Sequence, residues 1–241
     1  MRISRIYIEQ PLALNRDVTL DSERTHYLQH VLRLKPGNEV AVFNARDGEM
    51  RAVIADLSRH SATLQLKELI KPPATAVEGG QLHLILGLSR SERMDYAIQK
   101  STELGVCSIT PLLTEFGEVR IKPDRTDNKM RHWHKIIVGA AEQCGRLDLP
   151  QLNKPLEFDQ WQPASDSVTL LLEPTASERI AIEGNGDLNL LIGPEGGFSD
   201  QEIATAKSAG YKLVKLGDNV LRTETAPVAA LAILQYLKGQ I

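Results

Sequence analysis

The chain has 241 residues, of which 42% are hydrophobic and 24% are charged, and its formal net charge is −3. This length suits one large or two modest domains with real hydrophobic cores. No apolar run approaches the twenty or so residues of a membrane span, and the start of the chain lacks the apolar stretch of a signal peptide, so we expect a cytoplasmic protein. Only Cys107 and Cys144 are present, without CxxC spacing, which argues against a disulfide framework and a Cys-rich zinc site.

The first 71 residues are expected to form a small β-rich domain. Asp21 can cap a short helix that ends near Pro36. Asp47 and Gly48 predict a tight turn between two of the strands. The expected strands are residues 3–8, 40–44, 50–57 and 61–69. The Pro- and Gly-containing stretch 71–80 is typical of a linker.

From residue 72 onward, strand-like and helix-like segments alternate, which predicts an α/β domain with a mostly parallel sheet. The expected strands are residues 82–86, 109–113, 168–172, 188–192 and 212–216. The expected helices are residues 94–104, 127–144, 200–209 and 226–237. The last helix is apolar almost all round, so we expect it to be buried against another surface.

Two Gly-containing segments lie near the carboxyl terminus, IGPEGGFS at residues 192–199 and LGDNVLRTETAP at residues 216–227. Each follows a short apolar strand and leads into a helix, the first through a capping box of Ser199 and Glu202. Their glycines let the backbone come close to a ligand, and α/β sheets bind ligands at the carboxyl ends of neighbouring parallel strands. Neither GxGxxG nor GxxxxGK[ST] is present, so a nucleotide held by its phosphates is not expected.

Three further segments add to this pattern: HYLQHVLRLKPG at residues 26–37, QKSTELGV at 99–106 and AAEQCGR at 140–146. Together with the two glycine segments they resemble the 16S ribosomal RNA uracil-N3 methyltransferases of the SPOUT superfamily, collinearly over nearly the whole chain. The resemblance implies a PUA-like, β-barrel-like RNA-binding domain over residues 1–71 and a SPOUT domain over residues 72–241 with a carboxyl-terminal trefoil knot. It also implies S-adenosylmethionine as cofactor, small-subunit ribosomal RNA or the assembled small subunit as substrate, and a homodimer.

Two alternatives remain open. The glycine segments alone also fit a SPOUT methyltransferase that acts on a transfer RNA base or ribose, although HYLQHVLRLKPG and QKSTELGV argue against it. A noncatalytic RNA-binding or assembly module with the same fold is the other alternative. A thiolate mechanism through Cys144 is disfavoured, because no neighbouring base would activate it. No metal site is expected, since His132 and His134 point to different faces of a helix.

Arg222 and Glu224 are the expected catalytic residues. N3 of uracil carries a proton, so the site should supply a base or stabilise the uracil anion. Arg222 could stabilise charge on a uracil carbonyl oxygen, and Glu224 could accept the proton or hold Arg222 in place. An ion pair at a helix start or an interface is the competing interpretation for Arg222.

Cofactor binding is expected to rest on backbone groups and apolar contacts, because adenine and a thioether-like chain suit a mostly apolar pocket. Glu173 or Glu195 could lie near the positive sulfonium. The expected cofactor residues follow three strands: Leu171, Leu172, Glu173 and Pro174, then Ile192, Gly193, Glu195, Gly196 and Gly197, and finally Leu216, Gly217, Val220, Leu221 and Ala226.

RNA binding is expected to depend on local positive charge, which does not require a basic chain. Residues 120–146 hold seven Lys or Arg, two His and three acids. A solvated helix face is the alternative interpretation of this segment. The residues expected to contact RNA are Arg5, His26, Arg33, Gln143 and Arg146.

Overall fold

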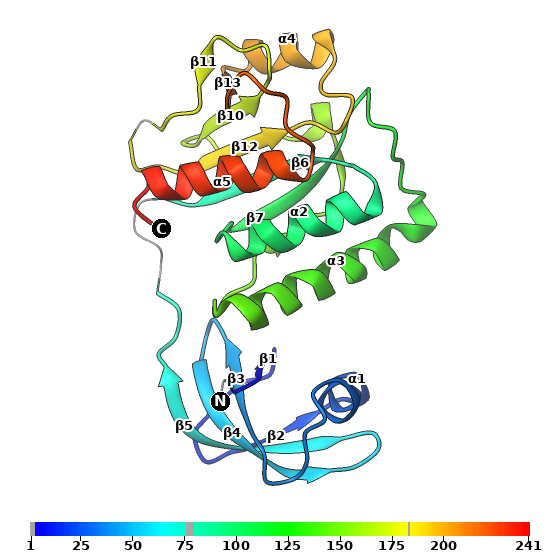
Figure 1. Ribbon diagram of the computed structural model, residues 1–241, viewed down its shortest axis with the longest axis vertical. Helices are drawn as coiled ribbons and strands as arrows, with labels where there is room; N and C mark the ends of the chain where they lie inside the picture. The colour runs from blue at the N-terminus through cyan, green and yellow to red at the C-terminus, as the bar shows by residue number, and fades with distance from the viewer. Residues whose placement is uncertain (1–2, 76–79, 183) are drawn as a thin grey trace. The chain divides into compact units, whose positions relative to one another are not determined.

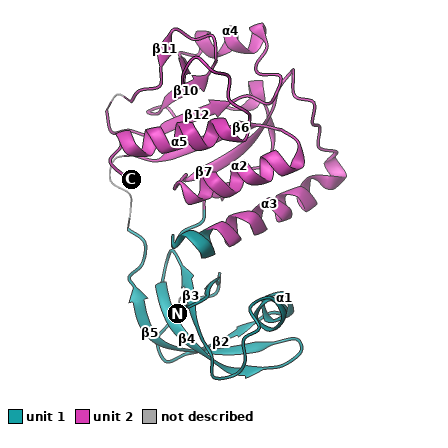
Figure 2. Cartoon of the chain, in the orientation of Figure 1, with its two compact units in different colours: residues 1–76, 141–149 teal, residues 77–140, 150–241 magenta. Residues whose placement is uncertain are grey.

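The computed structural model describes residues 3–75, 80–182 and 184–241. Its internal contacts divide the chain into two compact units (Figure 2). Unit 1 comprises residues 1–76 together with Ala141–Leu149, and unit 2 comprises Val77–Ala140 and Pro150–Ile241. The segment Ala141–Leu149, which the sequence analysis assigned to the second domain, therefore packs with the first unit. Residues 76–79 of the expected linker lie outside the described residues.

Unit 1 is built on one mixed five-stranded sheet with the order β1-β3-β4-β5-β2. Its strands are β1 (Arg5–Tyr7), β2 (Asp17–Leu20), β3 (Glu39–Asn44), β4 (Gly48–Leu57) and β5 (Ala62–Lys71). β1 pairs with β3 in parallel, whereas the other pairs are antiparallel. Register shifts interrupt the β4–β5 ladder, and such irregularities bend and twist a sheet. The prediction of a small β-rich amino-terminal domain is confirmed.

A short helical segment follows β2. Asp21 caps α1 (Ser22–His26) as predicted, because its carboxylate accepts a hydrogen bond of 2.8 Å from the backbone N–H of Arg24. A π-helical turn, Tyr27–Val31, continues directly from α1. It buries Leu28 completely in the core of unit 1, so the helical segment is held to the sheet by an apolar contact.

Unit 2 contains one sheet of eight strands, all paired in parallel (Figure 1). The order is β11-β13-β10-β12-β6-β7-β8, with β9 also beside β7. The strands are β6 (Leu82–Gly87), β7 (Ser108–Leu113), β8 (Gln151–Leu152), β9 (Leu156–Glu157), β10 (Val168–Leu172), β11 (Glu178–Arg179), β12 (Leu188–Ile192) and β13 (Lys212–Lys215). All five strands predicted for this sheet are confirmed, whereas the two-residue strands β8, β9 and β11 had no pattern long enough to predict them.

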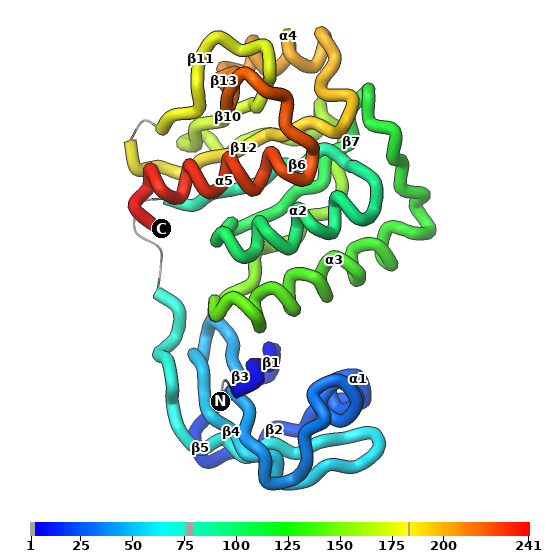
Figure 3. The backbone as a smooth tube through the Cα atoms, viewed as in Figure 1, coloured from blue at the N-terminus to red at the C-terminus, as the bar shows by residue number. Residues whose placement is uncertain are grey.

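Four helices accompany this sheet: α2 (Ser91–Glu103), α3 (Pro123–Cys144), α4 (Asp200–Ser208) and α5 (Thr225–Leu237). α2 and α5 pack side by side, and Gln235 donates a hydrogen bond of 2.6 Å to the backbone oxygen of Leu104 at the end of α2. The path from β12 through α4 to β13 and α5 can be followed in Figure 3. Within the described ranges, no helix is long and apolar enough to cross a membrane.

Candidate active site

Three chain segments of unit 2 surround a cavity at one edge of the sheet. β13, β10 and β12 are neighbours and run parallel, so their carboxyl ends lie together. The segments that follow these strands, residues 173–175, 193–198, 216–217 and 219–223, line a cavity of about 700 Å³. This volume lies in the range typical of small-molecule sites.

The cavity brings together most of the residues predicted to bind the cofactor. Thirteen of them line it: Leu172, Glu173, Pro174, Ile192, Gly193, Glu195, Gly196, Gly197, Leu216, Gly217, Val220, Leu221 and Ala226. Leu171 does not line it, because its side chain is fully buried in a core with Leu191 and Phe198. Successive side chains of a strand point to opposite faces, so Leu172 and Leu171 cannot both face the same cavity.

The loop after β12 depends on glycine for two different reasons. A Cβ at Gly196 would lie 2.7 Å from the backbone oxygen of Phe116, closer than such atoms approach. Gly197 has open space around it but adopts a φ of +70°, a conformation that L-residues with a side chain rarely tolerate. A larger residue is therefore excluded at Gly196 by a clash with the protein backbone, and at Gly197 by the left-handed backbone conformation.

The start of α4 fixes the far end of the same loop. Ser199 and Glu202 form the predicted capping box, with hydrogen bonds of 3.2 Å and 2.8 Å between side chain and backbone. The Glu202 carboxylate also accepts a hydrogen bond of 2.9 Å from the backbone N–H of Glu115. One buried side chain thus connects the cavity loop to the segment after β7.

Only one of the two predicted catalytic side chains lines the cavity. Arg222 is exposed and belongs to the lining. Its backbone oxygen accepts hydrogen bonds of 2.9 Å from Thr225 and Ala226, which form the first turn of α5. Glu224 is not among the lining residues, and its carboxylate lies 3.7 Å from Nε of Arg93. The ion pair of Glu224 is therefore with Arg93, and the alternative in which Glu224 holds Arg222 by a direct pair is not supported.

Arg93 lines the cavity but was not predicted from the sequence. It lies in the first turn of α2, and its guanidinium also forms an ion pair of 2.7 Å with Glu195. No local sequence pattern around Arg93 predicted that it would line the cavity, because its partners Glu195 and Glu224 lie more than one hundred residues later in the chain. The other lining residues that were not predicted are Thr175, Pro194, Phe198, Asp200, Ile203, Lys215, Asn219 and Thr223.

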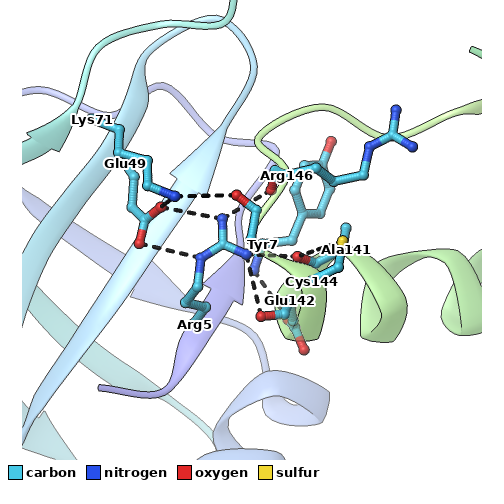
Figure 4. Close-up of polar contacts among 9 residues, drawn as sticks. Arg5, Tyr7, Glu49, Lys71, Ala141, Glu142, Cys144 and Arg146 are labelled. Carbon is cyan, nitrogen blue, oxygen red and sulfur yellow. Dashed lines mark hydrogen bonds and ion pairs between the residues drawn. The ribbon is translucent and has the colours of Figure 1, made fainter. Parts of the chain in front are cut away.

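Arg5, predicted to contact RNA, is buried at a polar junction within unit 1. Its guanidinium pairs with Glu49 at 3.2 Å, and the two side chains are only 7% and 5% exposed. The same guanidinium donates hydrogen bonds to the backbone oxygens of Ala141, Glu142 and Arg146, at 2.6, 3.2 and 2.9 Å (Figure 4). Arg5 therefore stabilises the end of α3, and its donors are engaged by the protein itself. Its expected role as an RNA contact is not supported by this geometry.

Other charged groups complete this junction. Lys71 lies 3.5 Å from Glu49 and donates a hydrogen bond of 3.2 Å to the backbone oxygen of Gly145. Glu142 accepts a hydrogen bond of 3.1 Å from the backbone N–H of Tyr7. Burial raises the pKa of Glu142, although the Tyr7 hydrogen bond and the nearby positive charges oppose that shift.

The remaining predicted RNA contacts differ in their accessibility. Arg146 is mostly buried and pairs with Asp148 at 2.6 Å. Gln143, His26 and Arg33 are exposed. His26 lies beside a second histidine, His30, with 4.4 Å between the ring centroids. The exposed candidates thus lie at the end of α1 (His26), just beyond the π-helical turn that follows it (Arg33), and on the last turn of α3 (Gln143).

The described part of the chain contains no group of three or more His, Cys, Asp or Glu side chains that could hold a metal ion. Cys144 is exposed at the end of α3, and its sulfur lies 3.9 Å from the backbone oxygen of Ala141. The cavity described above is lined by no cysteine and no histidine. Its polar chemistry comes from arginine, lysine, carboxylate, hydroxyl, amide and backbone groups.

Two family models match separate parts of the chain. An RNA methyltransferase PUA domain matches residues 20–67, within unit 1. An RNA methyltransferase domain matches residues 77–235, which include the whole cavity. The second match covers well over half of the chain.

The chain is also similar along its full length to curated proteins and solved structures. It is 34% identical to ribosomal RNA small subunit methyltransferase E of Buchnera aphidicola, covering 100% of this chain and 98% of that protein, and 31% identical to that of Rickettsia conorii, covering 98% and 97%. A methyltransferase of Legionella pneumophila, solved with the bound cofactor SAM, is 35% identical with a TM-score of 0.89 over 98% of both chains. Ribosomal RNA small subunit methyltransferase E from Neisseria gonorrhoeae, bound to S-adenosyl methionine, is 28% identical with a TM-score of 0.86 over 98% of both chains. The chain therefore belongs to the RNA methyltransferase family that includes ribosomal RNA small subunit methyltransferase E.

Proposed function

We propose that this protein uses S-adenosylmethionine to methylate N3 of a uracil in small-subunit (16S) ribosomal RNA. The observation that carries the proposal is the cavity at the carboxyl ends of β10, β12 and β13, whose lining includes an exposed arginine, Arg222. Relatives that are similar over the whole chain are named small-subunit ribosomal RNA methyltransferases, which supports the same substrate here.

The lining residues fit S-adenosylmethionine. Leu172, Ile192 and Leu216 offer apolar surface for the adenine, and the glycines after β12 leave backbone groups accessible. Glu173 is engaged by hydrogen bonds from Thr175, at 3.1 Å from its N–H and 2.8 Å from its hydroxyl. The bound cofactor supplies a methyl group on a positive sulfonium. The lining carries three carboxylates, Glu173, Glu195 and Asp200, and three basic side chains, Arg93, Lys215 and Arg222, so an individual carboxylate, and not the net charge of the cavity, would face the sulfonium.

Arg222 is the residue to which we assign stabilisation of the uracil anion. N3 becomes nucleophilic when its proton passes to a solvent water, and negative charge then grows on the neighbouring carbonyl oxygens. A guanidinium at that position stabilises the charge as it develops, which lowers the barrier of the transfer step. Glu224 is engaged by Arg93, so we assign it a positioning role in preference to that of general base.

The assembly and the RNA contacts are part of the same proposal. Adjacent helices α2 and α5 expose large apolar side chains on unit 2, among them Tyr96, Ile233, Tyr236 and Leu237. This apolar surface supports a homodimer. Exposed Arg33, His26 and Gln143 on unit 1 are the proposed RNA contacts. A ribosomal RNA substrate supports a cytoplasmic location for the enzyme.

The test is to incubate the protein with labelled S-adenosylmethionine and either naked 16S ribosomal RNA or small subunits that lack the modification, and then to map the methylated base. We expect one labelled uridine methylated at N3. Label on a ribose, on another base or only on transfer RNA would refute the assignment. The Arg222→Ala variant serves as the control for activity from a contaminating enzyme.

A further inference from the structure

Arg93 lines the cavity and forms ion pairs with two separate chain segments. Its Nη1 lies 2.7 Å from Oε1 of Glu195, in the loop after β12. Its Nε lies 3.7 Å from Oε2 of Glu224, at the start of α5. All three side chains are partly buried, with exposed fractions of 34%, 24% and 22%, so water screens these charges less than on an open surface.

The helix that carries Arg93 is a firm support. Met94, Ala97 and Ile98 of α2 are almost completely buried in unit 2. The carboxylates that Arg93 binds belong instead to loops that surround the cavity. The guanidinium thus reaches from a packed helix to two segments whose positions define the site.

The ion pair with Glu224 connects Arg93 to the chain segment that carries Arg222. Glu224 precedes the first turn of α5, whose N–H groups at Thr225 and Ala226 bind the backbone oxygen of Arg222. Moving the Glu224 carboxylate would therefore move the turn that carries Arg222. Without the guanidinium, two carboxylates near the same point would also repel each other.

We propose that Arg93 is a positioning residue that links the loop after β12 to the start of α5 and thereby places Arg222 at the cavity. This inference rests on the proposed function for the role of Arg222. It assigns Glu195 and Glu224 the role of partners of Arg93. A lysine cannot replace Arg93 fully, because a compact ammonium does not span two carboxylates as a planar guanidinium does.

The test compares Arg93→Ala and Arg93→Lys with Arg90→Ala as a matched control. Arg90 lies three residues earlier, and both it and its partner Glu118 are well exposed, at 72% and 65%. Two quantities are measured: the Kd for S-adenosylmethionine by calorimetry, and the single-turnover rate of methyl transfer to small subunits. We expect both Arg93 variants to keep the fold, as circular dichroism would show. Arg93→Ala should bind the cofactor at least about tenfold more weakly and transfer the methyl group at least about tenfold more slowly. Arg93→Lys should recover part of each loss, and Arg90→Ala should match the unaltered protein.

A double-mutant cycle with Glu224→Gln separates positioning from direct ligand contact. If Arg93 acts through Glu224, the double variant loses no more than Arg93→Ala alone. Losses that multiply would mean that Arg93 acts independently of Glu224, as a direct ligand contact would, and they would overturn the proposal, as would unchanged values in a folded Arg93→Ala variant. The cycle can be measured on the cofactor Kd without RNA, so it still tests the role of Arg93 if the proposed RNA substrate is wrong. If the unaltered protein does not bind the cofactor at all, the proposed function itself is refuted.

Discussion

Arg222 differs from Arg93, the other arginine that lines the cavity, in being exposed while its own backbone oxygen anchors the first turn of α5. Arg93 is instead bound between carboxylates. We predict that Arg222→Ala lowers the single-turnover rate of methyl transfer about a hundredfold or more, since that is the usual loss when one preorganised donor is removed. The Kd for S-adenosylmethionine should change little, and Arg222→Lys should restore little of the rate. A normal rate in Arg222→Ala would show that this residue only shapes the cavity.

The two glycines after Pro194 support a second prediction at the scale of single residues. Gly196→Ala brings a Cβ against the Phe116 backbone, and Gly197→Val forces a side chain onto a φ of +70°. Each substitution should displace the loop and weaken binding of S-adenosylmethionine at least about tenfold, or about 1.4 kcal/mol. Calorimetry on the folded variants measures this.

Gly139→Ala is the matched control for the glycine variants. Gly139 lies within α3, and a Cβ added there would meet open space, so alanine should be neutral or slightly stabilising. If both loop variants bound the cofactor as tightly as this control does, the loop after β12 would not belong to the cofactor site.

Sequence patterns predicted the local features of these elements and failed where distant segments meet. The caps at Asp21 and Ser199 follow from short-range hydrogen bonding, so a local pattern was enough to find them. Arg5 looked like a phosphate contact because no local pattern shows that the end of α3, 136 residues away, supplies its partners. Arg93 was missed for the same reason. The predicted trefoil knot depends on how the whole chain is threaded, and it stays a prediction.

At the scale of elements, the end of α3 leads to a prediction about Arg5. The last carbonyls of a helix lack intrahelical partners, and a positive group there also interacts favourably with the helix dipole. Arg5→Ala removes these donors and leaves the buried Glu49 with Lys71 alone. Breaking a buried ion pair costs about 3 to 5 kcal/mol. We expect a loss near the lower value in urea unfolding, because Lys71 remains as a partner.

Arg46→Ala provides the comparison for the Arg5 variant. Arg46 pairs with Asp47 at 2.9 Å on the surface of unit 1, with 60% of its side chain exposed. Such surface pairs contribute little to stability, because water and salt screen them. If Arg5→Ala were as stable as Arg46→Ala and instead lowered the salt dependence of RNA binding, Arg5 would be an RNA contact after all.

At the scale of the whole molecule, unit 2 exposes large apolar side chains, and these bear on whether one chain alone forms a complete enzyme. Tyr236 is 72% exposed on α5, and Leu237 and Ile233 of the same helix are partly exposed. Val220, which lines the cavity, is 77% exposed. An apolar residue so open at a binding site suggests that a second subunit covers it in the working enzyme.

We therefore predict that Tyr236→Glu weakens dimer formation at least about a hundredfold, because the interface would have to bury an unpaired carboxylate, at a cost of several kcal/mol. Sedimentation at a series of protein concentrations measures the dissociation, and Ala204→Glu on the exposed surface of α4 should leave it unchanged. Methyl transfer should fall with the fraction of dimer, since Val220 would lose its cover. A Tyr236→Glu protein that is monomeric and fully active would show that each cavity is complete within one chain. A variant that stays dimeric would place the interface on another face.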